Sequence, residues 1–139
     1  MKVMSRKSKG INAERELVHM FWSNGWGAAR VAGSGSMKYP SPDLIAGNGV
    51  RRLVIECKAI AGTNQYFGRS DVDDLREFAS KLNAEPWIGM RFDVLKWFFI
   101  SLDELKETKT EFSVNLMLAK RKGLSFEELI GKFHQTVLE

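Results

Sequence analysis

The chain has 139 residues, of which 44% are hydrophobic and 27% are charged, a composition typical of a single soluble globular domain. Its apolar runs are too short to cross a membrane and no signal peptide is recognisable, so we expect a cytoplasmic protein without membrane partners. Cys57 is the only cysteine, which excludes an internal disulfide. The formal net charge of +4 favours a polyanionic partner.

We expect residues 1–10 to form a mobile basic arm and residues 11–139 to form one domain. The arm carries basic residues and no acidic one: Lys2, Arg6, Lys7 and Lys9. Such an arm either binds nucleic acid or only aids solubility as a solvated tail, and the sequence leaves both interpretations open.

The apolar spacing predicts a helix over residues 11–24, with Gly25 as its C-cap. Glu14 lies on the same stripe as the apolar residues, whereas Glu16 falls on another face. A carboxylate that faces a core is costly unless a cation or strong donors receive it. Glu14 is therefore either a metal ligand or half of a structural ion pair.

A short strand is expected over residues 26–32 and a polar loop over residues 33–42. Two apolar runs then flank the turn sequence Gly47-Asn48-Gly49, which predicts a β-hairpin.

The second strand of this hairpin contains Glu56 and Lys58, which have no structural use in an aliphatic strand. Because strand side chains alternate, these two share one face. If position 46 pairs with position 51, Asp43 lies diagonal to Glu56 on that face, roughly 7–8 Å away. A slip of one residue would send Asp43 to the wrong face. We expect the first register.

The rest of the chain predicts further support for this hairpin. We expect a polar loop over residues 61–69, a helix with Ser70 as N-cap, and strands over residues 86–92 and 96–102. Residues 112–118 fit either a strand or a helix. A capping box at Ser125 opens a final helix. An aromatic cluster fits either the core or an interface between two copies: Trp87, Trp97, Phe98 and Phe99.

The charged residues of the hairpin suit phosphodiester hydrolysis. Asp43 and Glu56 are candidate ligands of Mg²⁺, with Mn²⁺ as a substitute and the carbonyl of Cys57 as a third ligand. Lys58 would orient the attacking water or stabilise the transition state, and Glu14 is within reach of the same ion. Zinc is not expected because His19 and His134 each lack a second histidine or cysteine nearby. No small-molecule cofactor is expected.

An aspartate followed by Glu-x-Lys on a hairpin resembles the signature of the restriction-endonuclease-like, PD-(D/E)xK nucleases. The order and spacing of the surrounding segments make the resemblance more specific, to the archaeal-type Holliday junction resolvases. The matching segments are Lys9-Gly10, Ala13-Glu14-Arg15-Glu16-Leu17, Arg30-Val31-Ala32-Gly33-Ser34, Pro42 to Gly49, and Ile55-Glu56-Cys57-Lys58. Cys57 departs from the family pattern, in which valine or methionine is usual.

The resemblance implies an α/β fold with a restriction-endonuclease-like core, a mixed central β-sheet flanked by helices. It implies Mg²⁺-dependent paired nicking of four-way DNA junctions in recombination and repair, by a homodimer. The implied metal ligands are Glu14, Asp43 and Glu56, with Lys58 as the catalytic lysine and Ser34 in the active site. The expected DNA-binding residues are basic side chains of the arm, the first helix and the loops: Arg6, Lys7, Lys9, Arg15, Arg30, Lys38 and Arg69.

Dimerisation also has a physical reason, because one chain offers one candidate site and symmetric nicks on two strands require two. Two alternatives stay open. One is a related nuclease of the same core that acts on other branched or linear DNA. The other is a DNA-binding module whose metal site is vestigial.

Overall fold

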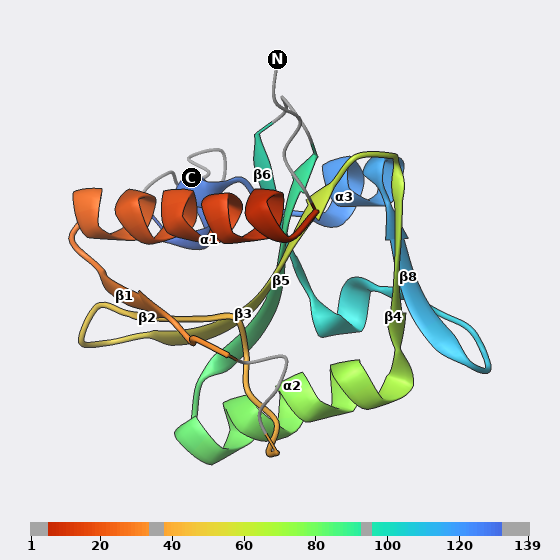
Figure 1. Ribbon diagram of the computed structural model, residues 1–139, viewed down its shortest axis with the longest axis horizontal. Helices are drawn as coiled ribbons and strands as arrows, with labels where there is room; N and C mark the ends of the chain where they lie inside the picture. The colour runs from red at the N-terminus through yellow and green to blue at the C-terminus, as the bar shows by residue number, and fades with distance from the viewer. Residues whose placement is uncertain (1–5, 34–37, 93–95, 132–139) are drawn as a thin grey trace, which may run out of the picture.

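The protein is built on a central sheet with helices on both of its faces (Figure 1). The structure is a computed structural model, and it describes residues 6–33, 38–92 and 96–131. Helix α1 covers one face of the sheet and helix α2 lies on the opposite side, while a second, smaller sheet stands beside them (Figure 1). This arrangement confirms the expected mixed α/β class, with a central sheet flanked by helices.

The elements follow in chain order. The helices are α1 (Arg6–Ser23), α2 (Arg69–Leu82), α3 (Leu116–Lys122) and α4 (Phe126–Leu129), with the 3-10 turn η2 (Leu102–Glu104). The strands are β1 (Gly27–Arg30), β2 (Leu44–Gly47), β3 (Arg52–Ile60), β4 (Asn64–Gly68), β5 (Glu85–Phe92), β6 (Trp97–Ser101), β7 (Lys106–Glu107) and β8 (Glu111–Asn115). The central sheet has the order β1-β2-β3-β5-β6, and the second sheet has the order β4-β8-β7. Strands β3 and β5 pair in parallel, and the other pairs are antiparallel.

Helix α1 begins at Arg6 rather than at residue 11, so residues 6–10 of the predicted arm are helical. Most side chains in this segment are good helix formers, which explains the extension. Residues 1–5 lie outside the described part of the chain, and the mobility of the arm stays a prediction. The helix ends at Ser23, and Gly25 terminates it as expected, with a left-handed φ of +84°. The N–H of Trp26 donates to the carbonyl of Phe21 at 3.0 Å, which closes a Schellman motif.

The hairpin of β2 and β3 is confirmed, but its predicted register is wrong by two residues. Ala46 pairs with Leu53 rather than with position 51. The cause is the turn, which is centred on Gly49 and Val50 because the Asn48 side chain accepts the N–H of Val50 at 2.9 Å. A slip of two residues preserves the face of every side chain, so the charged residues remain together.

Strand β4 replaces the polar loop that was expected over residues 61–69. It pairs with β8, about fifty residues further along the chain, and Phe67 stands opposite Phe112. A local pattern does not reveal such a partner, because strand preference depends strongly on the neighbouring strand. Asn64 and Tyr66 of β4 are exposed, whereas Phe67 is buried and Gln65 on the same face is half-buried.

The helix after β4 begins at Arg69 with Gly68 as N-cap, so the expected N-cap role of Ser70 is wrong. The ambiguous segment after residue 111 contains both alternatives, because β8 ends at Asn115 and α3 follows directly. The capping box is confirmed at α4, where the Ser125 and Glu128 side chains each bond the other's backbone N–H.

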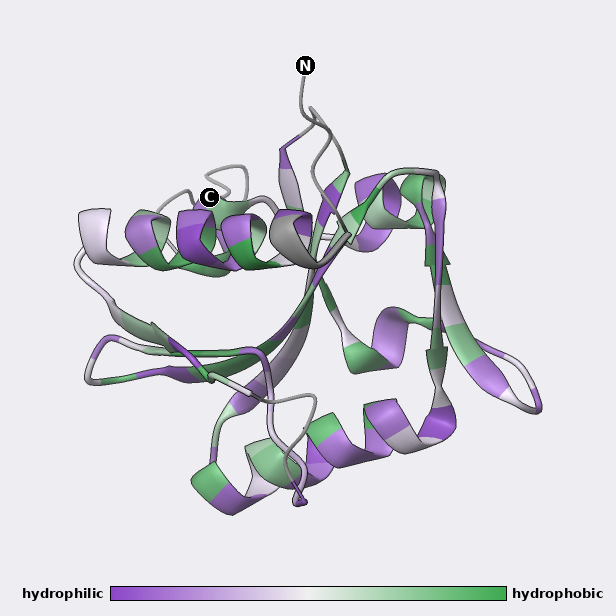
Figure 2. Cartoon of the chain, in the orientation of Figure 1, coloured by the Kyte–Doolittle hydropathy of each residue, from purple (hydrophilic) through white to green (hydrophobic). Residues whose placement is uncertain are grey.

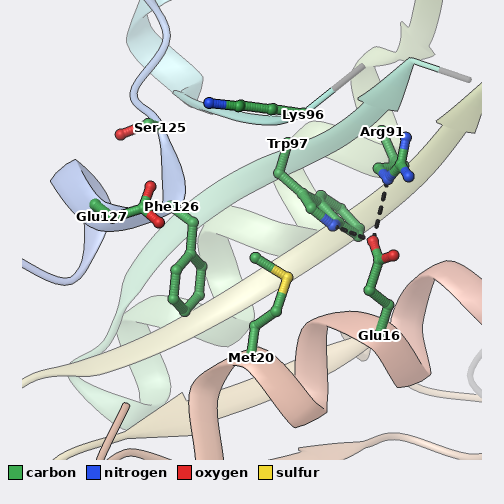
Figure 3. Close-up of a pocket in the computed structure, with 8 residues that line it drawn as sticks. All are labelled: Glu16, Met20, Arg91, Lys96, Trp97, Ser125, Phe126 and Glu127. Carbon is green, nitrogen blue, oxygen red and sulfur yellow. Dashed lines mark hydrogen bonds and ion pairs between the residues drawn. The ribbon is translucent and has the colours of Figure 1, made fainter. Parts of the chain in front are cut away.

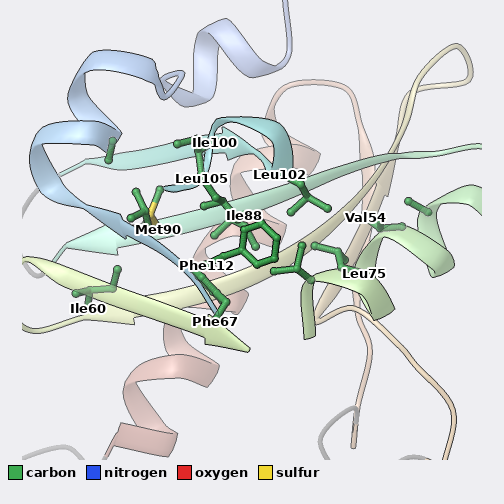
Figure 4. Packing of buried hydrophobic residues seen from close by; sticks show 14 of the residues in the cluster. Val54, Ile60, Phe67, Leu75, Ile88, Met90, Ile100, Leu102, Leu105 and Phe112 are labelled. Carbon is green, nitrogen blue, oxygen red and sulfur yellow. The ribbon is translucent and has the colours of Figure 1, made fainter. Parts of the chain in front are cut away.

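Two hydrophobic clusters cover the two faces of the central sheet. Neighbouring residues of β3 divide between them, because Val54 packs in the cluster toward α2 and Ile55 in the cluster toward α1. Figure 4 shows the cluster on the α2 side, which includes Phe67, Leu75 and Ile88. Full burial of each such side chain contributes roughly 1.5–3 kcal/mol. Figure 2 shows hydrophilic and hydrophobic residues alternating along both long helices, as one buried and one solvated face require.

The aromatic cluster belongs mainly to the core. Trp97 and Phe99 are buried on the α1 side, where their rings stack with centroids 5.7 Å apart. Trp87 and Phe98 are partly buried and pack against the two clusters. Within the described ranges, no helix is long and apolar enough to span a membrane.

Candidate active site

Glu56 and Lys58 lie in the middle of β3, on the face that is turned toward α2. Val54 and Ile60 of the same face are buried in the core. The Glu56 side chain keeps 29% of its surface exposed and Lys58 keeps 36%. The polar middle of β3 therefore opens to solvent between two apolar anchors, where a ligand has access to both charged groups.

Asp43 precedes β2 and stands beside Glu56. Leu44 pairs with Ile55, so continuing the register by one pair places Asp43 opposite Glu56. The backbone N–H of Asp43 donates to the carbonyl of Ile55 at 3.1 Å. The N–H of Cys57 donates to the Asp43 carboxylate, Oδ2, at 2.9 Å. The hairpin thus fixes both the backbone and the side chain of Asp43 next to Glu56.

The pKa of Glu56 is raised from 4.5 to about 8. Burial is the largest cause, and the negative charge of Asp43 is the next, while Lys58 acts in the opposite direction. Asp71 and Glu14 add smaller repulsions. Burial and the neighbouring carboxylates thus outweigh the positive charge of Lys58, and a bound cation would favour the ionised carboxylate.

Glu14 joins the group from α1, but its carboxylate has a protein partner. Arg30 of β1 donates from Nε to Oε1 of Glu14 at 2.9 Å. Burial still raises the pKa of Glu14, with the Arg30 hydrogen bond opposing the shift and Asp43 adding to it. Both of the proposed interpretations of Glu14 thus have support, because it is ion-paired and it also feels the charge of Asp43.

Lys58 is held near the carboxylates without a close ion pair. Its ammonium Nζ lies 3.9 Å from Oε2 of Glu56, beyond hydrogen-bond distance. The same nitrogen lies 5.9 Å from the centre of the Phe67 ring. Its donors are therefore available to a phosphate or a water.

The donor chemistry of the site suits a hard divalent cation. Asp43 and Glu56 offer carboxylate oxygens, and magnesium is commonly held by one or two carboxylates while it keeps several waters. Among the described residues, however, no group of three or more His, Cys, Asp and Glu side chains has the arrangement of a complete metal site. The third carboxylate, Glu14, is ion-paired with Arg30 instead. The fit is thus to an ion held by Asp43, Glu56 and waters.

The remaining expected site residues are scattered. Ser34 lies outside the described residues, and the side chains of Arg6 and Lys7 do as well. The side chains that are exposed, as a DNA contact requires, are Lys9, Arg15 and Lys38. Arg69 is tied into the β7–β8 turn instead, where it pairs with Glu107 at 2.9 Å and bonds the carbonyls of Thr108 and Lys109.

The interactions of two acidic residues were not predicted from the sequence. Asp71 lies in the first turn of α2 and contributes to the field at Glu56. Its only sequence signal was its place at a helix start. Glu16 was expected only to lie on another face of the helix than Glu14. Its Oε1 accepts Nε1–H of Trp97 at 2.6 Å and Nε–H of Arg91 at 3.1 Å. Figure 3 shows both donors converging on Glu16 at the wall of a pocket of about 360 Å³.

A mixed sheet that presents an aspartate and a Glu-x-Lys pair on one hairpin agrees with the expected restriction-endonuclease-like class of nucleases. Comparison with known proteins narrows the class. The sequence model of the archaeal Holliday junction resolvase (Hjc) family matches residues 5–138, and the chain belongs to this family. Both the predicted fold class and the predicted enzyme class, an endodeoxyribonuclease, are confirmed.

Individual relatives agree with this assignment. The chain is 36% identical over 129 residues to the crossover junction endodeoxyribonuclease Hjc of Archaeoglobus fulgidus, covering 93% of this chain and 94% of that protein. It is 32% identical to Hjc of Sulfolobus acidocaldarius, and the match covers 96% of this chain and 97% of that protein. The solved structure of Archaeoglobus fulgidus Hjc, described as a Holliday junction resolvase from an archaeal hyperthermophile, superposes with a TM-score of 0.83. That match has 34% identity and covers 92% of this chain and all of the other.

Proposed function

We propose that this protein resolves four-way DNA junctions by Mg²⁺-dependent nicking of two opposing strands, in recombination and repair. The observation that carries the proposal is the meeting of Asp43, Glu56 and Lys58 on one accessible face of the hairpin. Membership of the Hjc family supports the choice of substrate.

Each residue has a distinct part in the proposed reaction. Asp43 and Glu56 would hold Mg²⁺, with Mn²⁺ as a substitute, and the ion would supply Lewis-acid stabilisation of negative charge on the phosphate. Lys58 donates hydrogen bonds to the scissile phosphate or to the attacking water, because its ammonium is not closely paired. Glu14, fixed by Arg30, would reach the same ion directly or through a water. Ser34 would act from the loop before Asp43.

The contact with DNA is proposed to be mainly electrostatic. The exposed basic residues Lys9, Arg15 and Lys38 bind phosphates, together with Arg6 and Lys7 of the basic arm. A junction is then chosen by its shape rather than its base sequence. Arg30 and Arg69 each use part of the guanidinium for an ion pair within the protein, with Glu14 and Glu107 respectively.

A homodimer is part of the proposal, because two symmetric nicks need two identical sites at a fixed separation. We also place the protein in the cytoplasm, in contact with DNA. Sedimentation of the protein alone and with one junction tests the dimer. A single protomer on a junction that still receives paired nicks would contradict it.

The deciding experiment compares four-way, three-way and linear DNA of equal sequence, each labelled on every strand. We expect paired nicks at opposing positions of the four-way junction alone. Asp43→Asn and Glu56→Gln should abolish nicking and leave junction binding nearly intact. Asp74→Asn, on the exposed side of α2, is the control for loss of one negative charge and should cut normally.

The two alternative functions give different outcomes. Equal cutting of linear duplex would favour a related nuclease of the same core. Binding of the junction with no nicking in any divalent metal would favour a non-catalytic DNA-binding module. Unimpaired nicking by both Asp43→Asn and Glu56→Gln would overturn the proposed site.

A further inference from the structure

Phe67 is the buried residue of β4, and its ring lies below the ammonium of Lys58. The distance from Nζ to the ring centre is 5.9 Å, within the range of a cation–π contact. We propose that Phe67 is a positioning residue for the reaction: its ring face holds the Lys58 ammonium beside Asp43 and Glu56. This inference rests on the proposed nuclease function.

The ammonium needs such a support. Lysine has a flexible four-carbon stem, and ordering it costs up to about 2 kcal/mol of rotamer entropy. The carboxylate of Glu56 does not fix it, because 3.9 Å is too long for a hydrogen bond. The Glu14 carboxylate attracts the same charge only through a coulombic interaction, whereas the Phe67 ring lies within cation–π range of it.

An aromatic ring is a suitable support for a catalytic cation. A close carboxylate would occupy the donors of Lys58 and neutralise its charge. A ring face attracts the ammonium through its quadrupole, covers one side of it and takes no proton. The three N–H donors then remain available to a phosphate oxygen or a water.

The surrounding fold keeps the ring in place. Phe67 is 4% exposed and belongs to the hydrophobic cluster on the α2 side. It stands opposite Phe112 in the β4–β8 pair, and Figure 4 shows the two residues within the same cluster. The Phe112 ring in turn lies 5.2 Å below the guanidinium of Arg69. The second sheet therefore has a function in the site, because it presents Phe67 to β3.

Graded fluorination of Phe67 tests the proposal. Mono-, di- and trifluoro-phenylalanine at this position weaken the ring quadrupole progressively and change the shape of the side chain little. Single-turnover nicking of a four-way junction should slow stepwise, by about threefold to tenfold over the series. Junction affinity without metal and the melting temperature should stay constant. The same series at Phe92, which lies in the same cluster, is the control and should leave the nicking rate unchanged.

A second measurement does not depend on activity. The ε-methylene protons of Lys58 should show an upfield ring-current shift in the NMR spectrum, and Phe67→Leu should abolish it. A rate that is constant across the Phe67 series, or a Lys58 signal without this shift, would overturn the positioning role while the nuclease function stands. If the unmodified protein bound junctions and never nicked them, the proposed function would fail, and this inference with it.

Discussion

Arg30 and Glu14 are joined by a hydrogen bond of 2.9 Å from Nε to Oε1, which links β1 to α1 at the margin of the site. Their side chains are only 26% and 15% exposed, so the pair is shielded from water. Arg30 was expected to contact DNA, and in this conformation it holds a carboxylate that lies near Asp43. We regard the pair as the support that fixes the third acidic residue of the site.

The first prediction concerns this pair. Arg30→Ala leaves Glu14 half-buried without a donor, which costs about 1–3 kcal/mol and raises its pKa further. The nicking rate should fall in Arg30→Ala. The double variant Arg30→Ala, Glu14→Gln should lose less activation free energy than the two single variants lose together. A double-mutant cycle on single-turnover rates measures this coupling, expected at about 1 kcal/mol.

Binding measurements separate this support from a DNA contact. Arg15→Ala removes an exposed charge from α1. The slope of log affinity for the junction against log salt concentration should therefore become shallower by about one. Arg30→Ala should leave that dependence unchanged. Strictly additive rate losses, together with a reduced salt dependence for Arg30→Ala, would show that Arg30 contacts DNA instead.

The second prediction is a dependence of stability on pH in the absence of metal. The folded-state pKa of Glu56 is about 8 against an ordinary value of 4.5, so the folded protein binds the proton more tightly than the unfolded chain. Its contribution to stability is complete below pH 4.5 and is lost as the pH rises toward 8. Glu56→Gln should therefore stabilise the metal-free protein at pH 8, by roughly 2–4 kcal/mol. Urea unfolding in EDTA at several pH values measures the effect, and an equal change at every pH would contradict it.

The third prediction concerns the addition and removal of Mg²⁺. Ionised Glu56 binds the ion and protonated Glu56 does not, so Mg²⁺ should raise the melting temperature more at pH 8 than at acid pH. At a hundredfold excess over its dissociation constant, the ion adds about 2.7 kcal/mol of stability. EDTA should reverse the shift, and Glu56→Gln or Asp43→Asn should abolish it. The control variant Asp74→Asn should keep the Mg²⁺-induced rise in melting temperature. If Glu56→Gln also kept this rise, the ion would bind at another site.

Elements with strong local signals could be predicted from the sequence. Strands β5 and β6, the C-cap at Gly25 and the capping box at Ser125 each depend on residues within one turn or one strand. The carboxylates and Lys58 of the site stand out for a related reason, since charges in an aliphatic strand are unusual.

What could not be predicted depends on distant parts of the chain. Strand β4 forms because β8 pairs with it, and the hairpin turn is held by two backbone hydrogen bonds to the Asn48 side chain. The partner of Glu14 lies sixteen residues away, and the contact of Phe67 with Lys58 needs the second sheet. Local propensity and spacing do not specify such long-range contacts.

The last prediction concerns Arg51, which ties the hairpin turn to the start of β5 and to α4. Its guanidinium binds both carboxylate oxygens of Glu85 at 2.8 Å, donates to the carbonyl of Leu129 and lies over the Trp26 ring. Arg51→Met removes these contacts and should lower stability by about 2 kcal/mol, or the melting temperature by roughly 5–10 °C. Arg52→Met is the matched control, because Arg52 is exposed and makes one long bond to the Asn83 carbonyl.

The Arg51 effect should also depend on pH, with a sign opposite to that of Glu56. Arg51 lowers the pKa of Glu85 below 4.5, so the stabilisation is complete above that pH and is lost as the pH falls further. The difference in unfolding free energy between the original protein and Arg51→Met should therefore shrink in acid. The nicking rate at low temperature should stay unchanged, because the contacts of Arg51 lie at the hairpin turn and not at Asp43 and Glu56. Equal melting temperatures for Arg51→Met and Arg52→Met would show that the contacts of Arg51 contribute nothing to stability.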